Sequence, residues 1–186
     1  MKKQERVMTM SDHATEAIIL LGHGSRVPGA SRDMEAVAGR LKEKYEHALV
    51  EICFMSRLGP HFPEVLKHCV ESGATKVIVI PYFLHTGLHI LLDIPEMMQE
   101  EAKKFPDVEL ILGQRLSFDE ALVDLVEKNI KVSKGFGDVR QIQLPPKEEY
   151  PVPQGQPEFV PMLPEEAERY RKGRHPGKSV GEHGSL

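Results

Sequence analysis

The sequence predicts a three-layer α/β/α domain built around a small four-stranded parallel sheet. Four short apolar runs, at residues 17–21, 49–54, 76–83 and 108–113, alternate with amphipathic segments. Each run is too short for a helix, and most are rich in Val and Ile, as buried strands are. Strands that alternate with helices in this way form parallel sheets with right-handed crossovers. For a strand order of 2-1-3-4, we expect the order to reverse between the first and third strands.

The segments between and after the runs carry apolar residues at helical spacing. These residues are Met34, Val37, Ala38, Leu41 and Tyr45 in the first helix, Phe62, Val65, Leu66 and Cys69 in the second, and Phe118, Ala121, Leu122, Leu125 and Val126 in the last. The second helix is expected to end at Gly73. Asp93 is predicted to be the N-cap of the third helix, with Pro95 in its first turn. Ser117 begins a Ser-x-x-Glu capping box for the last helix.

The 186 residues divide into three parts by composition. Residues 1–16 are expected to be a flexible N-terminus, and residues 17–132 are expected to form the α/β domain. Residues 133–186 contain eight of the chain's 14 prolines and are predicted to be an extended or disordered tail. Within the tail, only residues 164–172 have the composition of a short helix, which would be marginal on its own.

Composition narrows the classes of partner. The chain has 24 basic and 28 acidic side chains, a formal net charge of -4, and therefore lacks the strongly basic character of a nucleic-acid-binding domain. No apolar run is long enough for a membrane span or a signal peptide, so we expect a cytoplasmic protein that binds no membrane. Cys53 and Cys69 are too few and too far apart for a disulfide framework and are expected to be buried, reduced thiols.

Histidines follow two of the predicted strands. The loop after the first strand reads GHGSR and carries His23, Ser25 and Arg26, while the loop after the third strand carries His85 and His89. Open parallel sheets bind ligands beyond the carboxyl ends of the strands, where the strand order reverses. Adjacent strands lie about 4.8 Å apart, so imidazoles from these two loops can converge on one ion or one substrate atom. The alternative, that each histidine caps its loop or faces solvent, stays open.

The GHGSR loop matches none of the common glycine-rich motifs. A nucleophile elbow needs Ser where Gly24 stands, and the third glycine of a dinucleotide fingerprint would fall on Val27. The lysine of a P-loop is missing as well. No nucleotide cofactor is therefore expected, and Gly22 and Gly24 are expected to serve the turn.

The stretch LLGHGSRVPGA, followed later by GATKVIVIPYFLHTGLHILLDIPE, resembles the short class II chelatases that insert a divalent metal into sirohydrochlorin. It is most similar to the sirohydrochlorin cobaltochelatases of anaerobic cobalamin (vitamin B12) biosynthesis, over roughly residues 17–130. The resemblance implies that His23 and His89 are the catalytic and metal-binding pair and that Co²⁺ is the metal substrate. Iron insertion for sirohaem (Fe²⁺) and nickel insertion (Ni²⁺) are the alternatives. The resemblance also implies a homodimer whose two domains wall in the flat macrocycle.

Sirohydrochlorin, the tetrapyrrole partner that the resemblance implies, carries many carboxylates, so basic groups near the crevice should steer and anchor it. We predict Ser25, Arg26, Arg57, His85 and Gly87 as substrate-binding residues. For the two arginines the alternative is ordinary surface charge, and for Ser25 it is a local turn bond. His85 is either a third metal ligand or part of its own loop.

The chain departs from the family in lacking acidic residues directly after the second strand. Many relatives carry glutamates after the second strand, whereas this chain has Ser56 and Gly59 at those positions. His61 or Glu64 are candidates to replace them, although His61 is equally suited to begin the second helix.

A metal-binding carrier without turnover is the alternative from another class. This alternative is supported by the absence of acids at Ser56 and Gly59 and by the two histidines of the tail, His175 and His183.

Overall fold

The computed structural model of the protein describes residues 15–25, 27, 29–45, 48–57 and 59–146. These residues belong to two units that join between Phe118 and Asp119. The predictions for Arg26, for residues 1–14 and for residues 147–186, including His175 and His183, lie outside this range. The predicted domain boundaries at residues 17 and 132 stay predictions.

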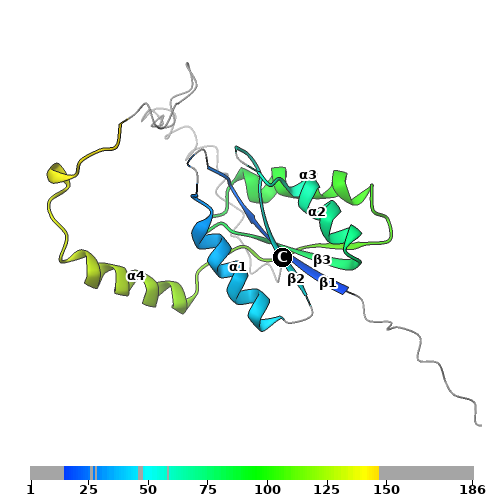
Figure 1. Ribbon diagram of the computed structural model, residues 1–186, viewed down its shortest axis with the longest axis horizontal. Helices are drawn as coiled ribbons and strands as arrows, with labels where there is room; N and C mark the ends of the chain where they lie inside the picture. Colours follow the sequence, from blue (N-terminus) through cyan, green and yellow to red (C-terminus); the bar gives the residue numbers. More distant parts are fainter. Residues whose placement is uncertain (1–14, 26, 28, 46–47, 58, 147–186) are drawn as a thin grey trace, which may run out of the picture. The chain divides into compact units, whose positions relative to one another are not determined.

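The first unit is built around a parallel sheet of four strands (Figure 1). Its strands are β1 (Thr15–Gly22), β2 (Leu49–Phe54), β3 (Ala74–Pro81) and β4 (Glu109–Leu112). The order is β2-β1-β3-β4, which confirms the predicted order. Leu21 pairs with Cys53 on one side and with Pro81 on the other, so the carboxyl ends of β1 and β3 lie next to each other.

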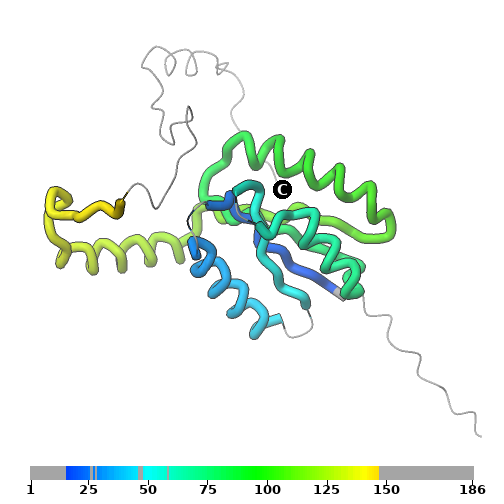
Figure 2. The backbone as a smooth tube through the Cα atoms, turned by 45° about the horizontal axis from the view of Figure 1, so that its top comes forward, coloured from blue at the N-terminus to red at the C-terminus, as the bar shows by residue number. Residues whose placement is uncertain are grey.

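Three helices cover the two faces of this sheet, as Figures 1 and 2 show. They are α1 (Arg32–Lys44), α2 (Phe62–Glu71) and α3 (Ile94–Ala102). On one face, Met34 and Ala38 of α1 pack with Ile18, Leu20 and Val50 of the strands. On the other face, α2 and α3 pack with the opposite side chains of the strands, contributing Phe62, Val65, Leu66, Cys69, Ile94 and Met98. The predicted three-layer α/β/α fold is therefore confirmed.

The predicted apolar faces of α1 and α2 differ in how fully they are buried. All four predicted residues of α2 are buried, and Gly73 follows the helix with a φ of 94°, as a C-terminal glycine does. In α1, by contrast, Met34 and Ala38 are buried while Val37 and Tyr45 are exposed. The core-facing stripe of α1 is thus narrower than its sequence pattern predicts.

The third helical segment begins earlier than predicted. A five-residue π-helix, η1 (His89–Asp93), leads directly into α3. Asp93 immediately precedes α3 and Pro95 lies in its first turn, as predicted, but Asp93 has helical backbone angles and its side chain caps no backbone N–H. Pro95 has no N–H and its ring would crowd the carbonyl four residues back in a regular helix, which a wider π turn relieves.

The second unit contains α4 (Glu120–Ser133) and a short 3₁₀ helix, η2 (Val139–Gln141). The N-cap of α4 is Asp119, whose Oδ1 accepts the Ala121 N–H at 2.8 Å, so the prediction of Ser117 as the cap was wrong. Asp119 is the last residue before the helix, which puts its carboxylate within reach of the free N–H groups of the first turn.

Near η2, hydrogen bonds from the Arg140 side chain and backbone N–H lower the pKa of the Asp138 carboxyl to about 2.

The two cysteines are free thiols in the core of the first unit, as predicted. Burial, aided by the charge of Cys69, raises the pKa of the Cys53 thiol. Burial, aided by Glu51, raises the pKa of the Cys69 thiol from 9.0 to about 11. Both thiols are therefore protonated at neutral pH and unreactive.

Within the described residues, none of the helices combines the length and the apolar character needed to cross a membrane.

Candidate metal-insertion site

Two histidines meet where the strand order reverses. His23 directly follows β1, and His89 opens η1 after β3. Their ring centroids lie 5.2 Å apart, with the ring planes tilted by 59°. Metal–imidazole bonds of about 2.1 Å hold two ligand nitrogens of one ion within about 4 Å of each other. The two rings are therefore spaced to share a single ion with little movement.

A third ring supports this pair. Phe83, just beyond β3, lies 6.4 Å from the His23 ring in an edge-on arrangement and 6.5 Å from the His89 ring. Phe83 is partly buried and packs on the core cluster of the α2 and α3 face. Phe83 therefore links both imidazoles to the interior. The sequence did not predict this contact, because Phe83 reads there only as the last residue of an apolar run.

The His23 loop is fixed through its backbone. Gly24 has a φ of 99°, and a Cβ there would lie 1.9 Å from the Ser56 carbonyl oxygen. The Ser56 N–H and hydroxyl both donate to the His23 carbonyl, at 3.2 and 3.1 Å. Gly24 is thus required for close approach as well as for the turn, and Gly22 for contact with Phe54, whose ring would lie 3.2 Å from an added Cβ.

The His23 side chain is held much less firmly than its backbone. The imidazole is exposed, and its Nδ1 lies 3.4 Å from the Gly24 carbonyl oxygen, at the outer limit for a hydrogen bond. The ring is therefore free to adjust to an incoming ligand.

The His89 side chain, by contrast, has a close partner. Its Nδ1 lies 2.6 Å from Oδ2 of Asp93, and both side chains are about half exposed. The sequence contains the signal for this pair, because residues four apart on a helix are neighbours. It was missed because Asp93 was interpreted as a cap.

Arg115 braces the segment that leads to His89, and sequence reasoning missed it as well. Its Nη1 donates to the Leu84 carbonyl at 2.9 Å. The guanidinium thus connects the loop after β4 to the loop after β3. A lone arginine after a strand offers no sequence signal for such a contact.

The other predicted substrate-binding residues lie around the two loops. Ser25 Oγ accepts the Val27 N–H at 3.0 Å, so the alternative of a local turn bond is realised. Arg57 is exposed and has a φ of 70°. His85 and Gly87 are exposed in the loop before η1, and the Gly87 carbonyl accepts the Ile90 and Leu91 N–H groups. Substrate binding by these residues stays a prediction.

The candidates for the missing acids are engaged at the start of α2. His61 is the N-cap of α2, which confirms that alternative, and Glu64 Oε2 accepts its N–H at 3.3 Å. The His61 Nδ1 lies 3.3 Å from the Phe54 carbonyl oxygen. Among the residues that the structure describes, no group of three or more His, Cys, Asp or Glu side chains is arranged to hold a metal ion.

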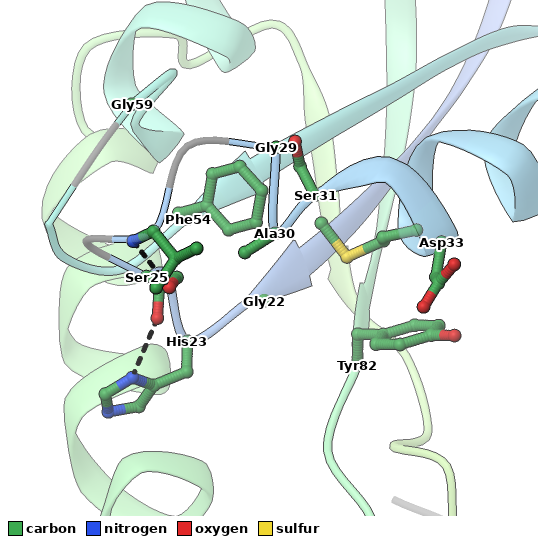
Figure 3. A pocket seen from close by; sticks show the side chains of 13 residues that line it. Gly22, His23, Ser25, Gly29, Ala30, Ser31, Asp33, Phe54, Gly59 and Tyr82 are labelled. Atoms are coloured by element: carbon green, nitrogen blue, oxygen red, sulfur yellow. Dashed lines mark hydrogen bonds between the residues drawn. The ribbon is translucent and has the colours of Figure 1, made fainter. Parts of the chain in front are cut away.

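A cavity of about 560 Å³ adjoins His23 between β1, β2 and the start of α1 (Figure 3). This volume falls in the range of small-molecule sites. Phe54, Tyr82 and Met34 give it apolar walls, and Asp33 adds a carboxylate. In the view of Figure 3, the His23 imidazole lies apart from Tyr82 and Asp33.

Four exposed leucines flank His89. Leu84, Leu88, Leu91 and Leu92 are between 52% and 68% exposed. Leu88, Leu91 and Leu92 lie within or next to η1, and Leu84 lies in the loop before it. We call these four residues the leucine surface. Such an apolar group beside a polar site is typical of a binding surface.

Comparisons with known proteins give consistent results. The CbiX family model matches residues 17–133. The sirohydrochlorin cobaltochelatase of Methanopyrus kandleri is 30% identical over 139 residues, which cover 64% of this chain and 97% of that protein. The sirohydrochlorin ferrochelatase of Priestia megaterium is 31% identical over 115 residues, which cover 62% of this chain and 43% of the relative.

Solved structures agree with the sequence comparisons. The sirohydrochlorin chelatase SirB from Bacillus subtilis subspecies spizizenii, in complex with cobalt, has a TM-score of 0.59 and 31% identity. The match covers 63% of this chain and 50% of SirB. The chain thus spans half or less of SirB and of the Priestia megaterium protein. Since the family model matches well over half of it, the chain belongs to the CbiX family.

Proposed function

We propose that the protein is a sirohydrochlorin chelatase and that Co²⁺ is its metal substrate. The observation that carries the proposal is the pairing of His23 and His89, 5.2 Å apart at the point where the strand order reverses. Neutral imidazole binds divalent first-row metals, and imidazole also accepts protons near neutral pH.

These two abilities match the needs of metal insertion. The reaction exchanges two pyrrole protons for one divalent ion: two N–H bonds break, bonds from the ring nitrogens to the metal form, and both protons pass to nearby bases. One imidazole holds the ion and releases it to the macrocycle, and the imidazoles then accept the protons and return them to water. No step needs a nucleotide.

The surroundings of the pair support a large anionic substrate. The cavity beside His23 offers room for part of the macrocycle or one of its side chains. Arg57 is exposed at the end of the neighbouring loop, where a guanidinium can bind a carboxylate. We assign Arg26 the same role from its place in the GHGSR motif.

The choice of cobalt rests on the relatives. The proteins from Methanopyrus kandleri and Methanocaldococcus jannaschii are named cobaltochelatases, and the match covers 97% and 58% of their lengths. The Priestia megaterium ferrochelatase is the longer protein, of which the match covers 43%. SirB structures contain cobalt in one case and Fe³⁺ in another, so iron is the main competitor.

A homodimer is part of the proposal. In a single copy, the described residues of the first unit contain the His23–His89 pair and leave the leucine surface exposed. A flat macrocycle needs a wall on each side, and the proposal assigns the opposite wall to a second copy of the chain. We assign the leucine surface to this interface.

The decisive experiment follows the absorbance of sirohydrochlorin under anaerobic conditions, without ATP, with Co²⁺, Fe²⁺ or Ni²⁺. The proposal expects the protein to accelerate cobalt insertion over the uncatalysed rate, with a higher kcat/KM for Co²⁺ than for Fe²⁺ or Ni²⁺. A higher kcat/KM for Fe²⁺ would overturn the cobalt assignment. Cobalt binding without any acceleration would overturn the chelatase and favour a carrier.

The homodimer is tested by light scattering coupled to size-exclusion chromatography. The wild-type chain is expected to have twice the mass of one copy, and Leu88→Glu with Leu92→Glu to have the mass of one. A monomeric wild-type chain would overturn the homodimer. Val37→Glu, which changes an exposed residue on α1, serves as the control.

A further inference from the structure

The side chain of Asp93 lies against His89, one of the two histidines of the candidate site. The distance of 2.6 Å between His89 Nδ1 and Asp93 Oδ2 is short even for a charge-assisted hydrogen bond. Both side chains are about half exposed, so water competes for each of them. A contact this close at an exposed position indicates that the backbone brings the two groups together.

The π-helix provides that backbone. His89 and Asp93 are its first and last residues, and the Ile94 N–H donates to the His89 carbonyl, which closes the wide turn. Ile94 itself is fully buried against the sheet. The position of Asp93 is thus set by the buried residue that follows it, and π turns of this kind are frequent at functional sites.

The contact determines which nitrogen of His89 is free. A carboxylate can only accept, so the hydrogen bond requires the proton on Nδ1. In a neutral imidazole Nε2 then carries the lone pair, which can bind a metal or accept a proton. Metal-binding histidines are commonly oriented in this way by a carboxylate on the other nitrogen.

We propose that Asp93 is a positioning residue that holds His89 in the Nδ1–H tautomer and presents its Nε2 to the metal. This inference rests on the proposed function for its consequence in metal insertion, but its structural content can be tested without substrate. It assigns Asp93 no direct contact with metal or macrocycle.

The test compares wild-type protein with Asp93→Ala and Asp93→Asn. Long-range ¹H–¹⁵N NMR at about pH 8 reports the tautomer of His89 in metal-free protein. We expect the Nδ1–H tautomer in the wild type and a shift toward Nε2–H in both variants, as happens when a histidine loses its carboxylate partner. Assignment of the His89 signals comes from their loss in His89→Gln.

Two further measurements follow the consequence for metal. Both variants are expected to bind Co²⁺ and to insert it about 10- to 100-fold less well, the usual effect of removing the partner of a metal ligand. The KM for sirohydrochlorin is expected to stay within about twofold, since Asp93 contacts His89 and not the macrocycle. Asp107→Ala, an exposed aspartate in the turn before β4, is the matched control and should match the wild type.

The outcomes separate this inference from the proposed function. If the tautomer of His89 is Nε2–H in the wild type, or the same in all three proteins, the inference is overturned even if the wild type is an active chelatase. If the tautomer shifts and Co²⁺ affinity falls in the variants while no protein inserts metal, the inference stands and the proposed function fails. Urea unfolding of each variant verifies that the fold is intact, which is expected because Asp93 has helical backbone angles that alanine favours.

Discussion

The two histidine segments of the site are held in opposite ways. At His23 the backbone is fixed, by the close approach of Gly24 to Ser56 and by two hydrogen bonds to the His23 carbonyl, while the imidazole is loosely held. At His89 a helical turn carries the residue, and the imidazole itself is bound to Asp93. A pair that must take up an ion and release it gains from one adaptable and one oriented ligand. The two histidines are therefore not interchangeable.

Removing either imidazole should have the largest effect. His23→Ala and His89→Ala are each expected to lower the rate of cobalt insertion by about 10²- to 10⁴-fold, because each removes a metal ligand and a proton acceptor. The double variant should be little worse than either single variant, since groups that act as a unit are not additive. Anaerobic absorbance measurements give these rates.

His68→Ala, which changes an exposed histidine on α2, is the control and should keep the wild-type rate. If both His23→Ala and His89→Ala kept wild-type rates, the site would lie elsewhere.

The backbone of the His23 loop should be the next most sensitive feature. Gly24→Ala adds a Cβ that would lie 1.9 Å from the Ser56 carbonyl oxygen, in a left-handed conformation that alanine disfavours. We expect a loss of at least about 2 kcal/mol in the free energy of unfolding, together with a loss of activity. Urea denaturation measures the first effect.

Gly39→Ala is the matched control, because Gly39 lies within α1 and an added Cβ meets nothing within 4 Å. It should be stabilising by about 0.5–1 kcal/mol. Equal effects at the two glycines would show that the His23 loop is not closely packed.

A smaller effect is expected from Ser56→Ala. The variant loses the hydroxyl that donates to the His23 carbonyl at 3.1 Å but retains the backbone N–H at 3.2 Å. We expect a loss of about 1 kcal/mol in the free energy of unfolding and a change of a few-fold in insertion rate. Ser72→Ala, at the exposed end of α2, serves as control. An effect on stability as large as that of Gly24→Ala would contradict this ranking.

The smallest effect concerns the two buried thiols of the core. Burial raises the pKa of Cys53 and raises the pKa of Cys69 to about 11, so the folded chain keeps protons that the unfolded chain loses near pH 9. The free energy of unfolding is therefore undiminished by the thiols below about pH 9 and declines as the pH rises toward 11, because the unfolded chain then loses its thiol protons first. Urea midpoints at pH 8, 9 and 10 measure the decline.

Other groups titrate in the same range, so the comparison needs a variant without thiols. Cys53→Ala with Cys69→Ala should be less stable at pH 8 and should show a shallower decline. An unchanged slope would mean that the thiols ionise equally in both states.

The local structure followed from the sequence wherever a pattern had one interpretation. Apolar runs located the four strands, and the apolar face of α2 with its terminal Gly73 was observed as predicted. Errors arose where two interpretations competed. Asp93 and Ser117 both stand where a capping residue can stand, and the sequence does not show which neighbouring group the side chain reaches.

The α/β class, the four strands and the placement of His23 and His89 after the first and third of them could be predicted from the sequence, because apolar periodicity leaves few alternatives. The strand order entered the sequence analysis as an assumption, and the structure shows that order. Three contacts became visible in the three-dimensional structure: the hydrogen bond between Asp93 and His89, the anchoring of the His23 carbonyl by Ser56, and the contact of Phe83 with both imidazoles. They could not be predicted because they depend on short distances between segments. Periodicity fixes which face a side chain occupies, whereas a hydrogen bond depends on fractions of an ångström set by the packing of Ile94 and the close approach of two loops.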